Sequence, residues 1–335
     1  MKVAVFNTKR YERRSLETAA QMIGKGCEIE FTFLEPRLDV HTAVLAHGHE
    51  AVLIFVNDAA NRAALEKLAE GGTKFLGTRS AGFNQIDRDA ARELGIQIAY
   101  VPAYSPNAVA EFTIGLILTL GRHIHEGHNR ARRADFNLEG LCGFELRDMT
   151  VGVYGTGRIG TNVVQLLSGF GCKILAYDET PNEEVMLRAS YVDTREELFR
   201  FCDILTLHVP LMPSTFHLVD AEALRQMKNG VFIINTSRGA LLDTPAVVEA
   251  LKERKVGFLA IDVYEEEASL FFEDHSSDII NDDTFARLLT FPNVIVTGHQ
   301  AFLTDRALRN IAETTVQNLS EFAAGIPCTN LVPNP

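Results

Sequence analysis

Residues 151–160 read Val-Gly-Val-Tyr-Gly-Thr-Gly-Arg-Ile-Gly, and this stretch decides the fold. The run 151–154 is typical of a buried strand, and the three glycines that follow have the spacing G-x-G-x-x-G. A helix-period segment, 159–170, comes next, and then a second apolar run, 173–177, ends at Asp178. A glycine hexapeptide alone is weak evidence. Strand, turn, helix and an acid about 20 residues further on are together the context of a dinucleotide-binding turn.

Each residue type in this motif has a physical reason. Gly155 permits the tight turn, Gly157 lets the backbone approach a pyrophosphate, and Gly160 allows the helix to lie close to the strand. Asp178 is placed to accept hydrogen bonds from ribose hydroxyls, and its charge, with that of Glu179, disfavours the extra phosphate of NADP. The motif therefore predicts NAD as the cofactor. The alternative is a glycine turn in an α/β sheet that binds no nucleotide.

The same alternation extends outward in both directions. Apolar runs typical of strands occur at 3–6, 29–33, 52–55, 74–76, 97–101, 204–207, 231–235, 258–261 and 294–296. Helix-period segments occur at 61–70, 87–94, 107–133 and 304–324. Alternating strands and helices predict an α/β protein with parallel sheets covered by helices.

Composition excludes several classes of protein. The chain has 335 residues, a formal net charge of −12 and 46% hydrophobic residues, which predicts about two globular domains. A pI near 5.3 disfavours nucleic-acid and anionic-membrane partners. No apolar run is long enough for a membrane span, and the run 3–6 is too short for a signal-peptide core.

The cysteines are five, scattered and without a CxxC pair: Cys27, Cys142, Cys172, Cys202 and Cys328. This pattern disfavours a disulfide framework and a zinc site, so no metal is expected. Small buried thiols in a reducing cytoplasm are the simplest interpretation.

Three polar residues follow strand candidates in the second half of the chain. Arg238 follows the run 231–235, Glu267 follows 258–261, and His299 follows 294–296. An arginine clamps a carboxylate through two hydrogen bonds, and a histidine exchanges a proton near neutral pH. A neighbouring carboxylate favours the protonated imidazole. Each residue alone is more often structural, but the three together, downstream of a nucleotide motif, predict 2-oxo-acid reduction.

These segments resemble the D-isomer-specific 2-hydroxyacid dehydrogenase family over essentially the whole chain, with Arg238, Glu267 and His299 at the positions of the family's catalytic trio. The branch of fermentative D-lactate dehydrogenases is the most similar. Its features match residues 101–104 (VPAY), 235–239 (NTSRG), 262–265 (DVYE), 270–274 (LFFED) and 298–302 (GHQAF).

The resemblance implies two doubly wound parallel-sheet domains, Rossmann/flavodoxin-like, with a cleft between them. Residues 1–102 and 300–335 form the substrate-binding domain, and 103–299 form the NAD-binding domain. It implies further cofactor contacts at Arg158, Ile159, Val209, Pro210, Thr215, Thr236, Ser237, Arg238 and Asp262, with Asp262 at the nicotinamide carboxamide or, alternatively, as a helix N-cap.

The implied substrate contacts are Ala81, Gly82, Tyr104, Phe302 and Phe55, together with Arg238 and His299. Phe55 would limit substrate size, although it also suits an ordinary core position, and Tyr104 also suits packing beside the hinge. Ser80 departs from the polar amide found in some relatives. The departure matters only if a side chain, rather than backbone N–H groups, holds the substrate carboxylate.

The activity implied is reversible, NADH-dependent reduction of pyruvate to D-lactate. Two alternatives stay open: another substrate, such as glyoxylate, hydroxypyruvate or a branched 2-oxo acid, and an NAD-sensing binding protein of the same fold. A cytoplasmic homodimer or homotetramer is expected, with the segment 107–133 as a candidate interface.

Overall fold

The computed structural model describes residues 1–23 and 28–333, so Cys27 lies outside the described residues. The chain divides into two compact units: unit 1 comprises Met1–Ser105 and Leu303–Pro335, and unit 2 comprises Pro106–Phe302. The boundaries expected from the sequence, 102/103 and 299/300, lie a few residues before the observed ones.

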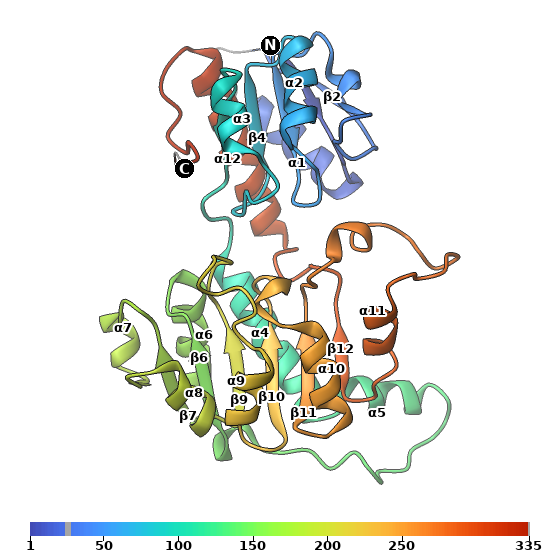
Figure 1. Cartoon of the computed structure of the whole chain (residues 1–335), viewed down its shortest axis with the longest axis vertical. Helices are drawn as coiled ribbons and strands as arrows, with labels where there is room; N and C mark the ends of the chain where they lie inside the picture. The colour runs from blue at the N-terminus through green and yellow to red at the C-terminus, as the bar shows by residue number, and fades with distance from the viewer. Residues whose placement is uncertain (24–27, 334–335) are drawn as a thin grey trace. The chain divides into compact units, whose positions relative to one another are not determined.

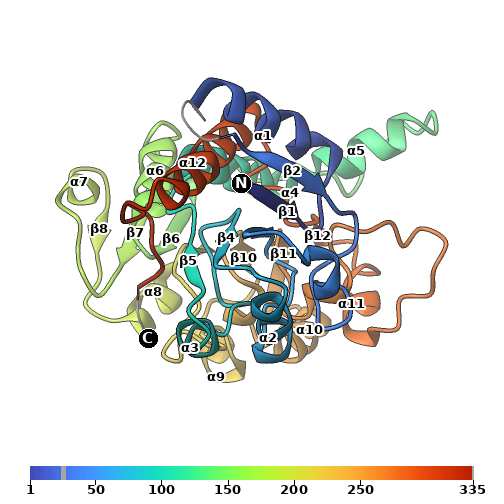
Figure 2. The same cartoon turned by 90° about the horizontal axis from the view of Figure 1, so that it is seen from above.

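Unit 1 is a parallel five-stranded sheet in the order β2-β1-β3-β4-β5, the flavodoxin-like order. Its strands are β1 (Lys2–Val5), β2 (Glu30–Phe33), β3 (Ala51–Ile54), β4 (Phe75–Thr78) and β5 (Gln97–Ala99). Its helices are α1 (Arg10–Ile23), η1 (Ala43–Ala46), α2 (Arg62–Glu70), α3 (Arg88–Glu93) and α12 (Asp305–Ala323). Helices α1 and α12 cover one face of the sheet, and α2 and α3 cover the other (Figure 2).

Unit 2 is a parallel seven-stranded sheet in the order β12-β11-β10-β9-β6-β7-β8 (Figure 1). Its strands are β6 (Thr150–Tyr154), β7 (Lys173–Tyr177), β8 (Ser190–Tyr191), β9 (Ile204–Leu207), β10 (Val231–Asn235), β11 (Val256–Ile261) and β12 (Val294–Val296). Its helices are α4 (Pro106–Gly121), α5 (Ile124–Ala131), η2 (Leu146–Asp148), α6 (Arg158–Ser168), α7 (Glu183–Met186), α8 (Arg195–Phe201), α9 (Ala221–Gln226), η3 (Gly239–Leu241), α10 (Thr244–Lys252), η4 (Glu267–Ser269) and α11 (Asp283–Leu288).

Both faces of this sheet are buried, which explains its nearly continuous apolar strands. Val151 and Val153 of β6 pack under α4 and α6. Leu205 and Leu207 of β9 belong to the core under α8, α9 and α10. The predicted α/β class and the two parallel sheets are therefore confirmed.

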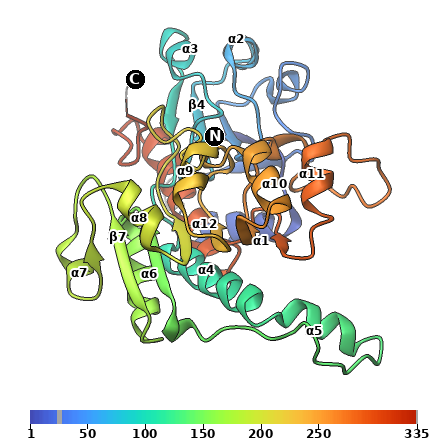
Figure 3. The same cartoon turned by 60° about the horizontal axis from the view of Figure 1, so that its bottom comes forward.

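The single helix predicted over 107–133 is wrong. Helix α4 ends at Gly121, His123 has a left-handed φ of 50°, and α5 begins at Ile124. A Cβ at Gly121 would lie 2.5 Å from the ring of Phe144, so this glycine lets the returning chain pack against the end of α4. Helix α5 has no buried residue and extends away from α4 (Figure 3).

Strand β8 was not predicted, because residues 190–191 show no apolar run. It is a two-residue edge strand that pairs with β7, Leu175 opposite Ser190 and Ala176 opposite Tyr191. In the part of the chain that the structure describes, no helix is both long and apolar enough to cross a membrane.

Candidate active site

The carboxyl ends of neighbouring strands in unit 2 carry the residues that the sequence singled out. Across β12, β11, β10, β9, β6 and β7, these ends lead to His299, Asp262, Arg238, Val209, Gly155 and Asp178. In a parallel sheet all these ends lie at one edge, and ligands bind where the strand order reverses. That reversal falls between β6 and β9, beside the glycine turn.

The glycine turn has no room for side chains at two of its positions. Gly155 has a φ of 94°, and a Cβ there would lie 2.6 Å from the carbonyl oxygen of His208. A Cβ at Gly160 would lie 1.9 Å from the carbonyl oxygen of Gly155. At Gly157, by contrast, no described atom lies within 4 Å of an added Cβ. The backbone before α6 therefore faces open space, as a bound pyrophosphate requires.

Asp178 is held by the glycine turn itself. Its Oδ2 accepts hydrogen bonds from the backbone N–H of Thr156 at 2.6 Å and from the Thr156 hydroxyl at 3.1 Å. The Tyr191 hydroxyl on β8 donates to Thr156 Oγ1 at 2.7 Å. The Asp178 carboxylate is thus oriented at the end of β7, and its contact with the ribose of NAD stays a prediction. Sequence reasoning missed Thr156 and Tyr191, since nothing local signals a contact between residues 35 positions apart.

His208, just before the loop after β9, is neutral. Burial lowers the pKa of its imidazole to about 3, and its Nε2 lies 2.9 Å from Thr206 Oγ1. A neutral histidine against the turn at Gly155 adds no positive charge to the N–H groups of the turn and of α6, which are oriented to attract phosphate.

The loop after β9 is braced by two hydroxyls that the sequence assigned to the cofactor. Thr215 Oγ1 donates to the Pro210 carbonyl at 2.7 Å and accepts from Met212 N–H at 2.8 Å. Ser237 Oγ donates to the Val209 carbonyl at 2.6 Å. These groups shape the loops, while their contact with a dinucleotide stays a prediction, as it does for Arg158 and Ile159 in the first turn of α6.

Arg238 lies at the tip of a tightly held turn after β10. The Asn235 side chain donates to the Arg238 carbonyl at 2.8 Å and accepts from Ser237 N–H at 3.0 Å. The buried Thr236 hydroxyl lies 2.9 Å from the hydroxyl of Thr113 on α4. The guanidinium is half-buried, and its Nη1 donates to the Ser237 carbonyl at 2.7 Å. The turn therefore limits where the cation can reach.

His299 and Glu267 form a direct pair. His299 Nδ1 lies 2.8 Å from Glu267 Oε1, and the Tyr264 N–H donates to the other carboxylate oxygen at 2.9 Å. The two side chains are 15% and 21% exposed, so they are shielded but reachable. Since Nδ1 is engaged, Nε2 is the ring nitrogen left to exchange a proton with a substrate.

Asp262 has a role in the structure that the sequence did not reveal. It is 1% exposed and accepts hydrogen bonds from the Thr297 hydroxyl, Gln300 N–H and Ala301 N–H at 2.5, 2.9 and 2.8 Å. Burial raises the pKa of its carboxyl group, and these donors act against that rise. Asp262 therefore holds the loop that carries His299, and the predicted contact with a nicotinamide stays a prediction.

Aromatic rings flank the histidine. The rings of Phe272 and Phe302 lie 5.7 and 6.5 Å from that of His299, centroid to centroid. Phe302, assigned from the sequence to the substrate-binding domain, belongs to unit 2. Such apolar walls exclude water from a proton-transfer site.

The other predicted substrate contacts belong to unit 1. Phe55 is buried at the end of β3, and Ala81 and Gly82 lie in the turn that follows β4. The Tyr104 carbonyl accepts from Asn310 Nδ2 at 2.5 Å. The Ser80 hydroxyl donates to the Gly82 carbonyl at 2.7 Å, so it is used within the turn.

No group of three or more His, Cys, Asp or Glu side chains in the described ranges is placed to hold a metal ion. Cys142, Cys172, Cys202 and Cys328 are free thiols.

Comparison with known proteins agrees with this geometry. Residues 114–301 match the family model described as D-isomer specific 2-hydroxyacid dehydrogenase, NAD binding domain. D-lactate dehydrogenase of Escherichia coli (strain K12) is 49% identical over 331 residues, 98% of this chain and 99% of that protein. The aromatic 2-oxoacid reductase of Clostridium sporogenes is 47% identical over 289 residues, 86% of this chain and 87% of that protein.

A solved structure of the apo form of D-lactate dehydrogenase from Escherichia coli covers 99% of this chain and 100% of its own, at 46% identity, with a TM-score of 0.89. The fold, the strand-end geometry and these matches lead to one conclusion: the chain belongs to the D-isomer specific 2-hydroxyacid dehydrogenase family and is built to use NAD.

Proposed function

We propose that the protein is an NAD-dependent D-lactate dehydrogenase, which reduces pyruvate to D-lactate with NADH and catalyses the reverse oxidation. The observation that carries this is the His299–Glu267 pair, 2.8 Å apart, at the same sheet edge as the dinucleotide turn. Arg238, on a neighbouring strand end, supplies the cation that a 2-oxo acid requires. The full-length similarity to a D-lactate dehydrogenase supports pyruvate as the substrate.

Arg238 clamps the substrate carboxylate and polarises the keto group. His299 donates its Nε2 proton to the keto oxygen, and Glu267 accepts the Nδ1–H bond that orients the ring and stabilises its charged form. In the oxidation, neutral His299 removes the hydroxyl proton. When bound, NADH supplies the hydride that reaches the keto carbon, so one hydride and one proton convert the ketone to an alcohol.

The remaining substrate contacts are proposed from the resemblance. Backbone N–H groups of Ala81 and Gly82 bind the carboxylate, and Tyr104 and Phe302 contact the substrate. Phe55 limits its size. The internal hydrogen bond of Ser80 supports binding by backbone rather than by its side chain.

A panel of 2-oxo acids with NADH and with NADPH, followed by chiral analysis of the product, tests the proposal. We expect pyruvate to give the highest kcat/KM, NADH to be preferred, and the product to be D-lactate. A preference for glyoxylate, hydroxypyruvate or a branched acid would assign another D-2-hydroxyacid dehydrogenase. Binding of NADH without turnover of any acid would favour the NAD-sensing alternative.

We also propose that the protein is a cytoplasmic homodimer or homotetramer. Exposed apolar side chains on and after α5 support self-association: Ile124, Phe136 and Leu138 are 55%, 76% and 79% exposed. Ile124 lies in the candidate segment 107–133 and the other two residues follow that segment, whereas α4, which forms its first part, is largely buried within unit 2. The free thiols are those expected in a reducing compartment.

A further inference from the structure

Arg79, directly after β4, is the largest fully buried side chain in the described part of the chain, at 1% exposed. Arginine is rarely buried, because its charge must be compensated. It was not among the residues that the sequence singled out, and no step of the proposed reaction uses it.

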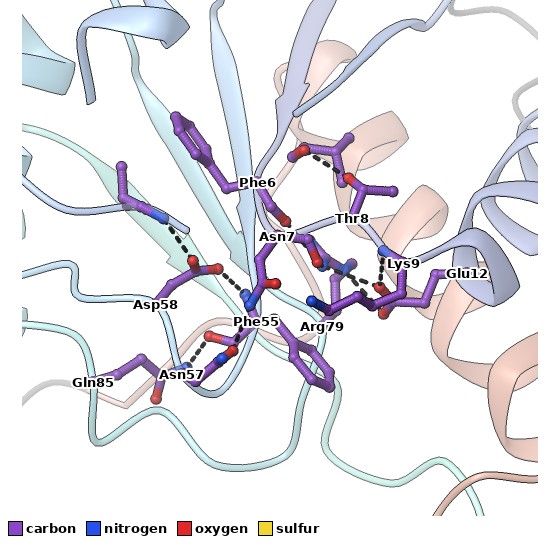
Figure 4. A network of polar contacts seen from close by, with 12 residues as sticks. Phe6, Asn7, Thr8, Lys9, Glu12, Phe55, Asn57, Asp58, Arg79 and Gln85 are labelled. Atoms are coloured by element: carbon purple, nitrogen blue, oxygen red, sulfur yellow. Dashed lines mark hydrogen bonds and ion pairs between the residues drawn. The ribbon is translucent and has the colours of Figure 1, made fainter. Parts of the chain in front are cut away.

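Its guanidinium joins three strand ends and a helix (Figure 4). Nε and Nη2 each lie 3.3 Å from a different carboxylate oxygen of Glu12 on α1, which makes the pair bidentate. Nη2 also donates to the carbonyls of Phe6 and Asn7 after β1, at 3.1 and 3.4 Å. The guanidinium carbon lies 5.5 Å from the ring centroid of Phe55, after β3.

This cluster occupies the place where the strand order of unit 1 reverses. Strands β2 and β3 lie on opposite sides of β1, and the crevice at such a reversal is where a doubly wound sheet binds ligands. In this protein the place is taken by a buried ion pair, Arg79–Glu12, whose side chains are 0% and 6% exposed. The pair is neutral overall, so it acts through geometry rather than net charge.

A contribution to the stability of the fold does not by itself explain the buried ion pair Arg79–Glu12. Arg79 Nη1 is buried and has no hydrogen-bond partner among the described residues. An unsatisfied buried donor is destabilising, and apolar residues of similar volume commonly replace a buried ion pair without loss of stability. The bidentate fork instead provides rigidity, which a flexible lysine would not.

The turn next to Arg79 is the one assigned to the substrate carboxylate. Arg79 N–H donates to the Ile54 carbonyl at 2.9 Å, and the Ser80 carbonyl accepts from Val101 N–H at 3.1 Å. We propose that Arg79 is a positioning residue: held by Glu12, it fixes the turn Ser80–Gly82 and the ring of Phe55, and so sets the affinity and size preference for the 2-oxo acid. This inference rests on the proposed function.

The test measures steady-state kinetics of the full-length Arg79→Lys and Glu12→Gln variants, with Arg62→Lys as the matched control. Arg62 forms an ion pair with Glu93 on the surface of the same unit. We expect the KM for pyruvate to rise about 10- to 100-fold in both test variants, as misplacement of a binding group predicts. The KM for NADH should stay within about twofold, and the ratio of kcat/KM for phenylpyruvate to that for pyruvate should rise.

A merely structural role gives a different result, because an unfolded fraction lowers apparent kcat without changing KM. A pyruvate KM within about twofold of wild type in both variants would overturn the proposal, whatever their kcat. If one variant does not fold, as judged by its circular dichroism melting curve, the other decides. Absence of 2-oxo-acid turnover in the wild type would refute the proposed function itself, which keeps the two failures distinct.

Discussion

His299 is held in an uncommon backbone conformation. Its φ is 54°, in the left-handed region, and its N–H donates to the Asp262 carbonyl at 2.7 Å. A left-handed non-glycine residue costs on the order of 1–2 kcal/mol, and such residues are concentrated at functional sites. The contacts of Asp262 with residues 297, 300 and 301 supply the support that keeps the ring directed at Glu267.

Replacing His299 by alanine should remove the proton donor and little else. We expect kcat for pyruvate reduction to fall by about 10²–10⁴-fold, the usual contribution of general acid catalysis. NADH affinity, measured by fluorescence titration, should be retained because the glycine turn and Asp178 are untouched. Near-normal turnover would contradict the assignment.

Asp58 predicts a pH dependence of stability. Burial raises the pKa of its carboxyl group from 3.8 to about 6, although Leu38 N–H and Phe55 N–H donate to it at 2.6 and 2.5 Å. The folded protein then binds the proton more tightly than the unfolded chain. The free energy of unfolding from this group therefore falls as pH rises from below about 4 to above about 6, by about 3 kcal/mol over the whole range.

Denaturant unfolding of wild type and Asp58→Asn across pH 4 to 7 isolates this effect. The variant should be the less stable protein at pH 4, since an amide provides one acceptor oxygen rather than two. The difference in the free energy of unfolding between the two proteins should become smaller toward pH 7, because the wild-type carboxyl group is then ionised and its burial is most unfavourable. Parallel pH profiles would mean that Asp58 does not titrate in this range.

The helices and strands of this protein are best predicted from the sequence where the local hydrophobic pattern agrees with the burial of the element. Strands β7, β9, β10 and β12 have the bounds of the predicted runs, and β6 begins one residue before its predicted run, at Thr150. Continuous apolar segments are typical of the strands of a parallel sheet covered by helices. The prediction of one helix over 107–133 was wrong because the local pattern does not show where that helix is interrupted. Its break at His123 depends on Phe144 packing against Gly121, a contact that local periodicity does not encode.

Gly157 and Gly160 open the same helix and should behave oppositely when each is changed to alanine. Gly160→Ala places a methyl group 1.9 Å from the Gly155 carbonyl oxygen and should lower the free energy of unfolding by about 1–3 kcal/mol. Gly157→Ala meets no described atom within 4 Å, so stability should change by less than about 0.5 kcal/mol.

The Gly157→Ala variant should instead weaken NADH binding by about tenfold or more, because the methyl group projects where the pyrophosphate approaches. Thermal melting without cofactor and NADH titration separate the two effects. Unchanged NADH affinity in Gly157→Ala would place the pyrophosphate elsewhere.

At the scale of the molecule, the exposed apolar residues after α5 predict association between copies of the chain. Leu138→Glu should shift the protein toward a smaller species in size-exclusion chromatography with light scattering, since a buried unpaired charge is costly at an interface. Leu187→Glu is the matched control, because Leu187, the residue after α7, is 80% exposed and Leu138 is 79% exposed. Equal molar masses for both variants would argue against this surface.

The sequence by itself determined the two parallel sheets, the glycine turn and the strand ends that carry Arg238, Asp262 and His299. These features depend on hydrophobic periodicity, on glycine's conformational range and on the rule that parallel strands end at one edge. Periodicity and glycine content can be read from short segments, and the rule on strand ends then applies to any parallel sheet. The fold class and the cofactor could therefore be predicted from the sequence.

Only the tertiary structure decided which side chains meet. Glu267 reaches His299 across 32 residues, Tyr191 reaches Thr156 across 35, and Glu12 reaches Arg79 across 67. Each contact needs a particular rotamer and a particular distance between separate elements, and many sequences with the same periodicity would place these groups apart. The break in the helix at His123 and the loop held by Asp262 likewise depend on contacts between residues that are distant in the sequence.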